Sequence, residues 1–212
     1  MDGEVRFPEV AGRSGRGGHV MGALALAGAF AIFGCTGCDS KAMGEPACAA
    51  QFIKGFGQAF LTRRLSSSLT WAQGYRLGLA AGFNGQRVPG FTEDFTERFR
   101  AGGANSVRGY ATDMLGEVDP DTKEPLGGEA VIVLNQELRF AGPRNFGAAV
   151  FYDAGSVFDR IKDFSLSLRH SVGFGLRYGS AIGLVRVDLA FPLNRRPQDR
   201  SYQIWFGLGQ AF

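Results

Sequence analysis

The stretch LTWAQGYRLGL, residues 69–79, changes the character of its side chains at every second position. Its even positions are small or polar, and its odd positions are mostly large and apolar. A β-strand points successive side chains to opposite faces, so a period of two predicts a strand with one apolar face and one polar face. The large apolar positions of this stretch are Leu69, Trp71, Tyr75, Leu77 and Leu79.

The same period recurs along the chain and predicts seven strands, with no convincing helix among them. In the first of them we expect Phe52, Phe56 and Phe60 to point outward and Gly55 and Gly57 to point inward. The predicted strands lie at residues 51–61, 69–79, 129–140, 146–158, 171–179, 184–193 and 201–212.

Two architectures fit this pattern. A soluble antiparallel sheet could pack its apolar face as a core. A transmembrane β-barrel is favoured because most strands approach the 9 to 11 residues that a tilted membrane strand needs, and aromatic residues cluster near strand ends. The chain also ends at an aromatic residue, Phe212. The predicted fold class is therefore all-β, an antiparallel transmembrane barrel. The aromatic residues near strand ends are Trp71, Tyr75, Tyr178, Phe191 and Tyr202.

The composition argues against several functions. The chain has 212 residues, a formal net charge of +3 and no basic stripe, so we expect no nucleic-acid partner. With only two histidines, no Ser/His/Asp or Cys/His set is formed, and we expect neither an enzyme nor a cofactor. Glycine is enriched, with 32 residues, and falls mostly on the polar face of the strands. Because glycine has no side chain, such a lumen wall leaves room for another segment to lie against it.

Residues 1–50 have the features of an export signal. Arg13 and Arg16 precede the apolar run VMGALALAGAFAIFG at residues 20–34, which is shorter than a membrane-spanning helix requires. Cys35 follows the run and is a candidate for lipidation. The alternative is a remnant segment without function. Zinc binding through Cys35 and Cys38 would need a second pair of ligands, so no metal site is expected.

Several short motifs occur in a fixed order over residues 51–212. Gly102-Gly103 is followed by Ser106-Val107-Arg108-Gly109-Tyr110, and later by Phe151-Tyr152-Asp153-Ala154-Gly155. Gly175-Leu176-Arg177-Tyr178, Arg186-Val187-Asp188 and the terminal strand complete the set. In this order they resemble the BamA/TamA superfamily of outer-membrane assembly factors, which also includes the two-partner-secretion translocators.

The resemblance implies a 16-stranded barrel preceded by periplasmic POTRA domains. Only seven strands are predicted here, whereas single-chain bacterial barrels have at least eight and usually an even number. We therefore expect the C-terminal half of a barrel, open or partial as a single chain. It would come from a truncated gene, a mis-called start, or a short form that pairs with another chain.

The resemblance also implies a site. A lid loop, residues 84–128, would fold back into the lumen, where Arg108 would contact Asp153, with Glu137 and Asp188 as further carboxylates. A guanidinium offers a planar fork of donors that matches a carboxylate. Alternatively, Arg108 is a solvated residue in a tight turn. The lid motif comprises Gly102, Gly103, Val107, Arg108, Gly109 and Tyr110. The terminal strand would carry a targeting signal of Tyr202, Phe206, Leu208 and Phe212.

The function implied by the resemblance is assembly, insertion or translocation of proteins at the bacterial outer membrane. A weak seam between the first and last strands would open and pair with incoming strands. The partners would be outer-membrane lipids, unfolded outer-membrane protein clients, and a barrel-completing chain or second copy. The alternatives are a structural or pore-forming partial barrel that pairs with another chain, and a non-functional fragment.

Overall fold

The computed structural model describes residues 23–36, 50–83, 88, 97–181 and 183–212. Within them the chain forms strands and one short 3-10 helix, η2 (Ile161–Asp163). No helix in these ranges is long and apolar enough to cross a bilayer. The strands are β1 (Ala23–Thr36), β2 (Ala50–Arg64), β3 (Leu69–Gly82), β4 (Ala130–Ala141), β5 (Phe146–Phe158), β6 (Arg169–Ser180), β7 (Gly183–Pro192) and β8 (Gln203–Leu208).

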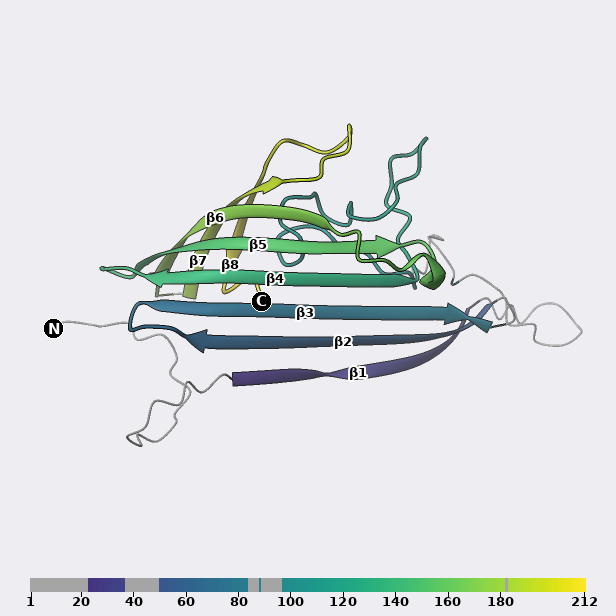
Figure 1. Ribbon diagram of the computed structural model, residues 1–212, viewed down its shortest axis with the longest axis horizontal. Coiled ribbons are helices and arrows are strands. Elements are labelled where there is room, and N and C mark those ends of the chain that lie inside the picture. The colour runs from purple at the N-terminus through teal and green to yellow at the C-terminus, as the bar shows by residue number, and fades with distance from the viewer. Residues whose placement is uncertain (1–22, 37–49, 84–87, 89–96, 182) are drawn as a thin grey trace, which may run out of the picture.

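The eight strands form one antiparallel sheet in which each strand pairs with its neighbours in sequence. Figure 1 shows them side by side as a single curved surface. The all-β antiparallel prediction is confirmed, and the seven predicted strands correspond to β2–β8. Among the described residues, β1 and β8 form the two edges of the sheet, and each pairs with one neighbouring strand.

The additional strand, β1, lies in the segment that resembles an export signal. Residues 23–36 are extended and pair with β2, with a register shift between Ala27 and Phe30. Small and large apolar residues alternate in this run, ALALAGAFAIF, so it also has the period of a strand. The strand count from sequence was one short because we treated the run as a continuous apolar segment. An export role for residues 1–50 and lipidation of Cys35 stay predictions.

The two ends of the sheet differ in their connections. Short turns join β2 to β3, β4 to β5 and β6 to β7, whereas the links at residues 83–129, 159–168 and 193–202 are long. Outer-membrane barrels have short periplasmic turns and longer extracellular loops. A 12-residue strand tilted as in such barrels spans about 28 Å, enough for the hydrocarbon core. The segment between β3 and β4 therefore starts from the end of the sheet that corresponds to the extracellular end of such barrels.

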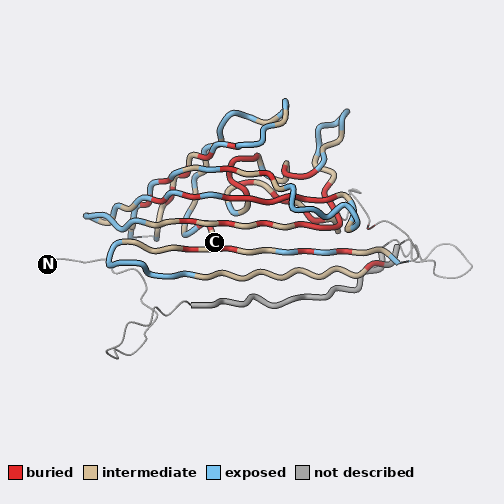
Figure 2. The backbone as a smooth tube through the Cα atoms, viewed as in Figure 1, coloured by how far each residue is buried: buried red, intermediate tan, exposed pale blue. Residues whose placement is uncertain are grey.

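From β3 to β8 the predicted faces are confirmed. Outward side chains such as Phe174 and Phe206 are 53% and 76% exposed. Inward carboxylates such as Asp153 and Asp188 are 0% exposed, because the segment after β3 covers them. In Figure 2 the buried parts of the backbone gather in that segment and in the strands it lies against.

The predicted orientation of β2 is wrong. Phe52 is buried, and the ring of Phe56 stacks on that of Phe99 at 6.2 Å between centroids. A Cβ atom added to Gly55 or Gly57 would meet nothing within 4 Å. The phenylalanines therefore face the lumen and the glycines face outward. Polar residues of β2 share the parity of the phenylalanines, and this signal should have decided the face: Lys54, Gln58, Thr62 and Arg64.

Inward aromatic rings lie opposite glycines on the neighbouring strand. Phe56 pairs in register with Gly78, and Phe151 pairs with Gly173. A Cβ atom on Gly173 would lie 2.4 Å from the Phe151 ring, so the ring occupies the space that the missing side chain leaves. The lumen thus has an aromatic side at β2, opposite the small inward residues of β3, and a charged side at β4–β7.

The end of the chain also departs from the prediction. Strand β8 ends at Leu208, and Gly209 adopts a φ of +83°, which takes the following residues out of the strand. Phe212 lies inside, with its ring 6.2 Å from that of Phe60. Tyr202, Phe206 and Leu208 are exposed, as predicted, but Phe212 does not share their face. The period of two cannot be extended past a turn at Gly209.

The orientation of β2 can be tested by placing a glutamate at either of two neighbouring positions and comparing the two variants. We expect Gly57→Glu to lower the free energy of unfolding by about 1–2 kcal/mol, because it puts a carboxylate on the lipid face. The matched variant Gln58→Glu puts it in the lumen opposite Arg76 and should change stability by less than about 1 kcal/mol. Urea unfolding in lipid vesicles measures both. The reverse order would restore the orientation predicted from sequence.

Candidate functional site

The segment after β3 returns into the lumen as a lid, by which we mean residues 97–128. The first part of the predicted lid loop, residues 84–96, lies outside the described residues except for Val88. At the base of the lid, Phe99 and Gly128 exchange two backbone hydrogen bonds, of 2.7 and 2.9 Å. The chain then enters β4 at Ala130. This lid base fixes both ends of the lid at the mouth of the sheet.

Glycines shape the lid where the backbone must turn. Gly102 and Gly103 have φ angles of +118° and +94°, a region that disfavours other residues. Gly109 is required for another reason, since a Cβ atom there would lie 2.4 Å from the Cβ of Ser171. Its N–H donates to the Ser171 hydroxyl at 3.2 Å. The lid tip, residues 104–110, therefore lies directly against β6.

Arg108 is fully buried at the lid tip. Its Nε and Nη2 donate to the two carboxylate oxygens of Asp153, at 2.8 and 2.9 Å. Its Nη1 donates to Glu137 at 2.7 Å and to Asp188 at 3.5 Å. The guanidinium carbon lies 3.4 Å from the centroid of the Phe151 ring. The structure thus brings together the four charged residues singled out from the sequence. We call Glu137, Asp153 and Asp188 the wall carboxylates.

These contacts make the burial of a full positive charge possible. Taking a guanidinium out of water costs several kcal/mol, and only close opposite charges with good hydrogen bonds offset that cost. Burial disfavours the charged form of Arg108, but the attraction and hydrogen bonds of Asp153 and Glu137 outweigh it, so the pKa of Arg108 lies above its ordinary value. The side chain stays protonated at every physiological pH.

Other arginines complete the charged side of the lumen. Glu137 accepts from Arg139 at 2.9 Å and from Arg177 at 3.3 Å. Asp188 pairs with Arg177 and also with Arg186, at 3.2 Å. Asp153 differs, since Arg108 is its only cationic hydrogen-bond partner within the described part of the chain. Asp153 therefore depends on the lid more than the other two carboxylates do.

Val107 and Tyr110 flank the arginine and fill space. Val107 is fully buried beside Gly155, where a Cβ atom would lie 3.0 Å from its side chain. The Tyr110 hydroxyl lies 3.0 Å from the backbone oxygen of His170, to which it donates, and burial raises its pKa. The Arg169 guanidinium stacks 4.0 Å from the centroid of the Tyr110 ring. The lid motif is thus seated along β5 and β6.

With the geometry described, comparison with known proteins identifies the family. The Omp85 superfamily domain matches residues 50–212. The chain belongs to the Omp85 superfamily. Members of this family are integral barrels of the outer membrane, so the protein is an outer-membrane protein.

The relatives include proteins named outer membrane protein assembly factor BamA. That of Nitratidesulfovibrio vulgaris is 33% identical over 122 residues, which is 55% of this chain and 15% of the relative. That of Neisseria meningitidis is 29% identical over 182 residues, 70% of this chain and 22% of the relative. A SAM50-like protein of Schizosaccharomyces pombe is 24% identical over 77% of this chain and 36% of the relative. The chain thus spans about a fifth of the bacterial relatives' length.

A solved structure has the same fold. The crystal structure of BamA from Haemophilus ducreyi lacking POTRA domains 1–3 superposes with a TM-score of 0.62. The two share 23% identity, and the match covers 76% of this chain and 35% of that one. The open sheet therefore corresponds to part of an Omp85 barrel.

Some residues that hold the lid were not predicted from the sequence. Asn135 donates to the backbone oxygen of Ser106 at 2.7 Å and to Asp153 at 2.8 Å. The Trp205 indole donates to the backbone oxygen of Arg108 at 2.7 Å. Asn135 and Trp205 both lie on the inward parity of their strands, which was the available signal. Each of them bonds to a backbone carbonyl of the lid, and sequence motifs do not identify such partners.

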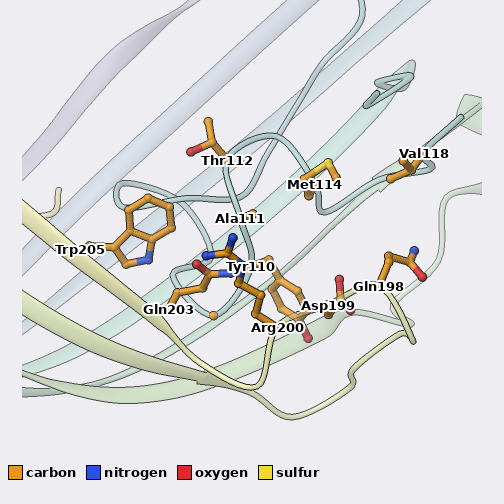
Figure 3. A pocket seen from close by; sticks show the side chains of 11 residues that line it. Tyr110, Ala111, Thr112, Met114, Val118, Gln198, Asp199, Arg200, Gln203 and Trp205 are labelled. Carbon is orange, nitrogen blue, oxygen red and sulfur yellow. The ribbon is translucent and has the colours of Figure 1, made fainter. Parts of the chain in front are cut away.

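A pocket of about 490 Å³ separates part of the lid from the last strand. Figure 3 shows that its lining comes from β8, with Gln203 and Trp205, and from the lid, with Tyr110, Ala111, Thr112 and Met114. Arg200 of the link before β8 also lines it. The lid therefore packs closely against β4–β7 but not against this part of β8.

Proposed function

We propose that the chain takes part in the assembly of outer-membrane β-barrel proteins, with β8 as the strand that receives an incoming strand. The observation that carries this proposal is the unpaired edge of β8. The names of the bacterial relatives support the process. Since the chain covers only part of those relatives, its activity, clients and partners belong to the proposal. No reaction chemistry is involved, because strand pairing is mechanical.

The register shows which backbone groups β8 offers. The Gly209 N–H donates to the Leu184 oxygen at 2.7 Å, and hydrogen-bonded pairs alternate along an antiparallel ladder. Trp205 and Gly207 therefore bond to β7. Ile204, Phe206 and Leu208 direct their backbone N–H and C=O groups to the free edge. An incoming strand can add there by β-augmentation.

We propose that the lid keeps the lumen closed before an incoming strand pairs with the edge. The buried Arg108 and the wall carboxylates hold its tip, and Phe99 stacked on Phe56 holds its base. A lid held in this way supports β4–β7 from inside, and it has one side-chain hydrogen bond to β8 within the described residues, from Trp205. The edge strand can then move without loss of the rest of the sheet.

Phe206→Pro tests the edge. Proline removes one N–H from the free edge but none from the ladder with β7, so we expect the sheet to stay folded and client insertion to fall to the spontaneous rate. The assay follows the folding of a small outer-membrane barrel into vesicles that contain the chain. Phe206→Leu keeps the N–H and should retain the wild-type rate.

Two results would count against this proposal. Equal rates for Phe206→Pro and Phe206→Leu would show that the β8 edge is not the receiving strand. A wild-type chain that forms a stable dimer in detergent and accelerates no insertion would instead support a pore-forming barrel made of two chains.

A further inference from the structure

We propose that Trp205 is a positioning residue that couples β8 to the lid, so that displacement of either one loosens the other. Its inward indole N–H donates to the backbone oxygen of Arg108 at 2.7 Å. The side chain of that same residue is anchored on β4, β5 and β7 through the wall carboxylates. One residue of the lid is therefore held by the charged wall at its side chain and by the last strand at its backbone.

The indole is the principal tie between these two elements. It is the only side-chain hydrogen bond from β8 to the lid within residues 97–181 and 183–212. The pocket of about 490 Å³ lies beside it, so close packing does not join the lid to the neighbouring part of β8. Loss of this one bond should thus be felt at the lid, whereas loss of a contact in a packed core would be shared among many neighbours.

A second residue of β8 supports the same part of the lid. A Cβ atom on Gly207 would lie 2.7 Å from Nε of Arg186, so the glycine leaves room for that side chain. Arg186 donates to Asn105 at 2.5 Å and to the backbone oxygen of Ala104 at 3.3 Å. Two successive inward positions of β8 therefore serve the lid tip. Trp205 bonds to it directly, and Gly207 leaves room for the arginine that bonds to it.

The position of β8 makes this coupling effective. The strand has six residues and, within the part of the chain that the structure describes, pairs with β7 alone, so it can open at lower cost than a central strand. A coupling free energy between two elements acts equally in both directions. A strand that pulls β8 away would loosen the lid, and a displaced lid would loosen β8. The use of this coupling in strand insertion rests on the proposed function, but the coupling itself does not.

Hydrogen exchange of the whole chain in detergent micelles tests the proposal. We expect Trp205→Phe, which keeps a ring but loses the donor, to speed exchange of lid amides by about five- to tenfold, as for one buried hydrogen bond. The chain has two tryptophans, and Trp71 also donates its N–H, to Gln136 on the outer face at 3.0 Å. Trp71→Phe is therefore a matched control and should leave lid exchange unchanged.

The reverse direction uses a lid variant. Arg108→Ala should speed exchange at the amides of Trp205 and Gly207, and should leave the β2–β3 ladder unchanged. In the Trp71→Phe background Trp205 is the sole tryptophan, so its emission should shift when Arg108→Ala frees the lid. This second measurement still decides the matter if Trp205→Phe does not fold.

Equal lid exchange in Trp205→Phe and Trp71→Phe, or unchanged β8 exchange and emission in Arg108→Ala, would overturn the coupling. The outcome is separable from that of the proposed function, because no client protein is present. Intact coupling without client insertion would contradict only the proposed function. Client insertion without coupling would remove only the role of Trp205.

Discussion

Arg108→Ala is expected to destabilise the folded chain by about 3–5 kcal/mol and to expose the lid to proteases. The truncation leaves Asp153 buried without its cationic partner, with Asn135 and the backbone N–H of residue 108 as its remaining hydrogen-bond donors. It also leaves the Phe151 ring without the guanidinium stacked on it. Urea unfolding in detergent measures the loss of stability, and limited proteolysis measures the exposure of residues 97–128.

Two further variants sharpen this result. Arg108→Lys keeps the charge but not the planar fork that bonds both oxygens of Asp153, so it should fall between wild type and alanine. Arg195→Ala removes an exposed arginine whose partner is Ser201, and should have no effect beyond about 0.5 kcal/mol. A lid that is equally protease-resistant in Arg108→Ala and wild type would show that the arginine does not hold it.

Gly109→Ala is expected to lift the lid tip although it removes no charged side chain. The new methyl group would lie 2.4 Å from the Cβ of Ser171 and 3.0 Å from the backbone nitrogen of Pro192. Neither atom can move without shifting a strand, and overpacking of this kind costs about 1–3 kcal/mol. Proteolysis and urea unfolding should therefore change in the same direction as in Arg108→Ala.

The matched control is Gly57→Ala, where a Cβ atom would meet nothing within 4 Å. That variant should be as stable as wild type or slightly more so, because alanine restricts the unfolded chain. Stability losses of similar size in both variants would mean that glycine is needed for strand pairing in general and not for the seat of the lid.

The fold from β3 to β8 could be predicted because polar and apolar side chains alternate there, so that each strand has one polar face and one apolar face. Asp153 and Asp188 lie on the inward parity of their strands, and the structure places both against Arg108. In β2 the phenylalanines lie on the same face as Lys54 and Gln58. The large apolar rings predict that this face points to lipid, whereas the polar side chains predict that it points to the lumen. The polar residues give the correct face, and the phenylalanines beside them made the sequence-based assignment wrong.

The remaining differences arise from contacts between distant segments. Phe212 turns inward because Gly209 ends the strand and Phe60 offers a ring to stack on. Trp205 and Asn135 bind backbone carbonyls of the lid, so their partners depend on how the lid folds. Sequence patterns assign a face to such residues, but the contact itself appears only when both segments are placed.

The two attachments of the lid differ in kind, and this sets the order in which they fail. At its base the lid has a two-bond backbone bridge and the stacked rings of Phe99 and Phe56, and rings tolerate small shifts in angle. At its tip it depends on charged hydrogen bonds, which weaken steeply when misaligned. The lid is therefore built as a flap on a hinge and not as a plug. Under strain it should swing away from Asp153 first and stay attached at the mouth of the barrel, ready to close again.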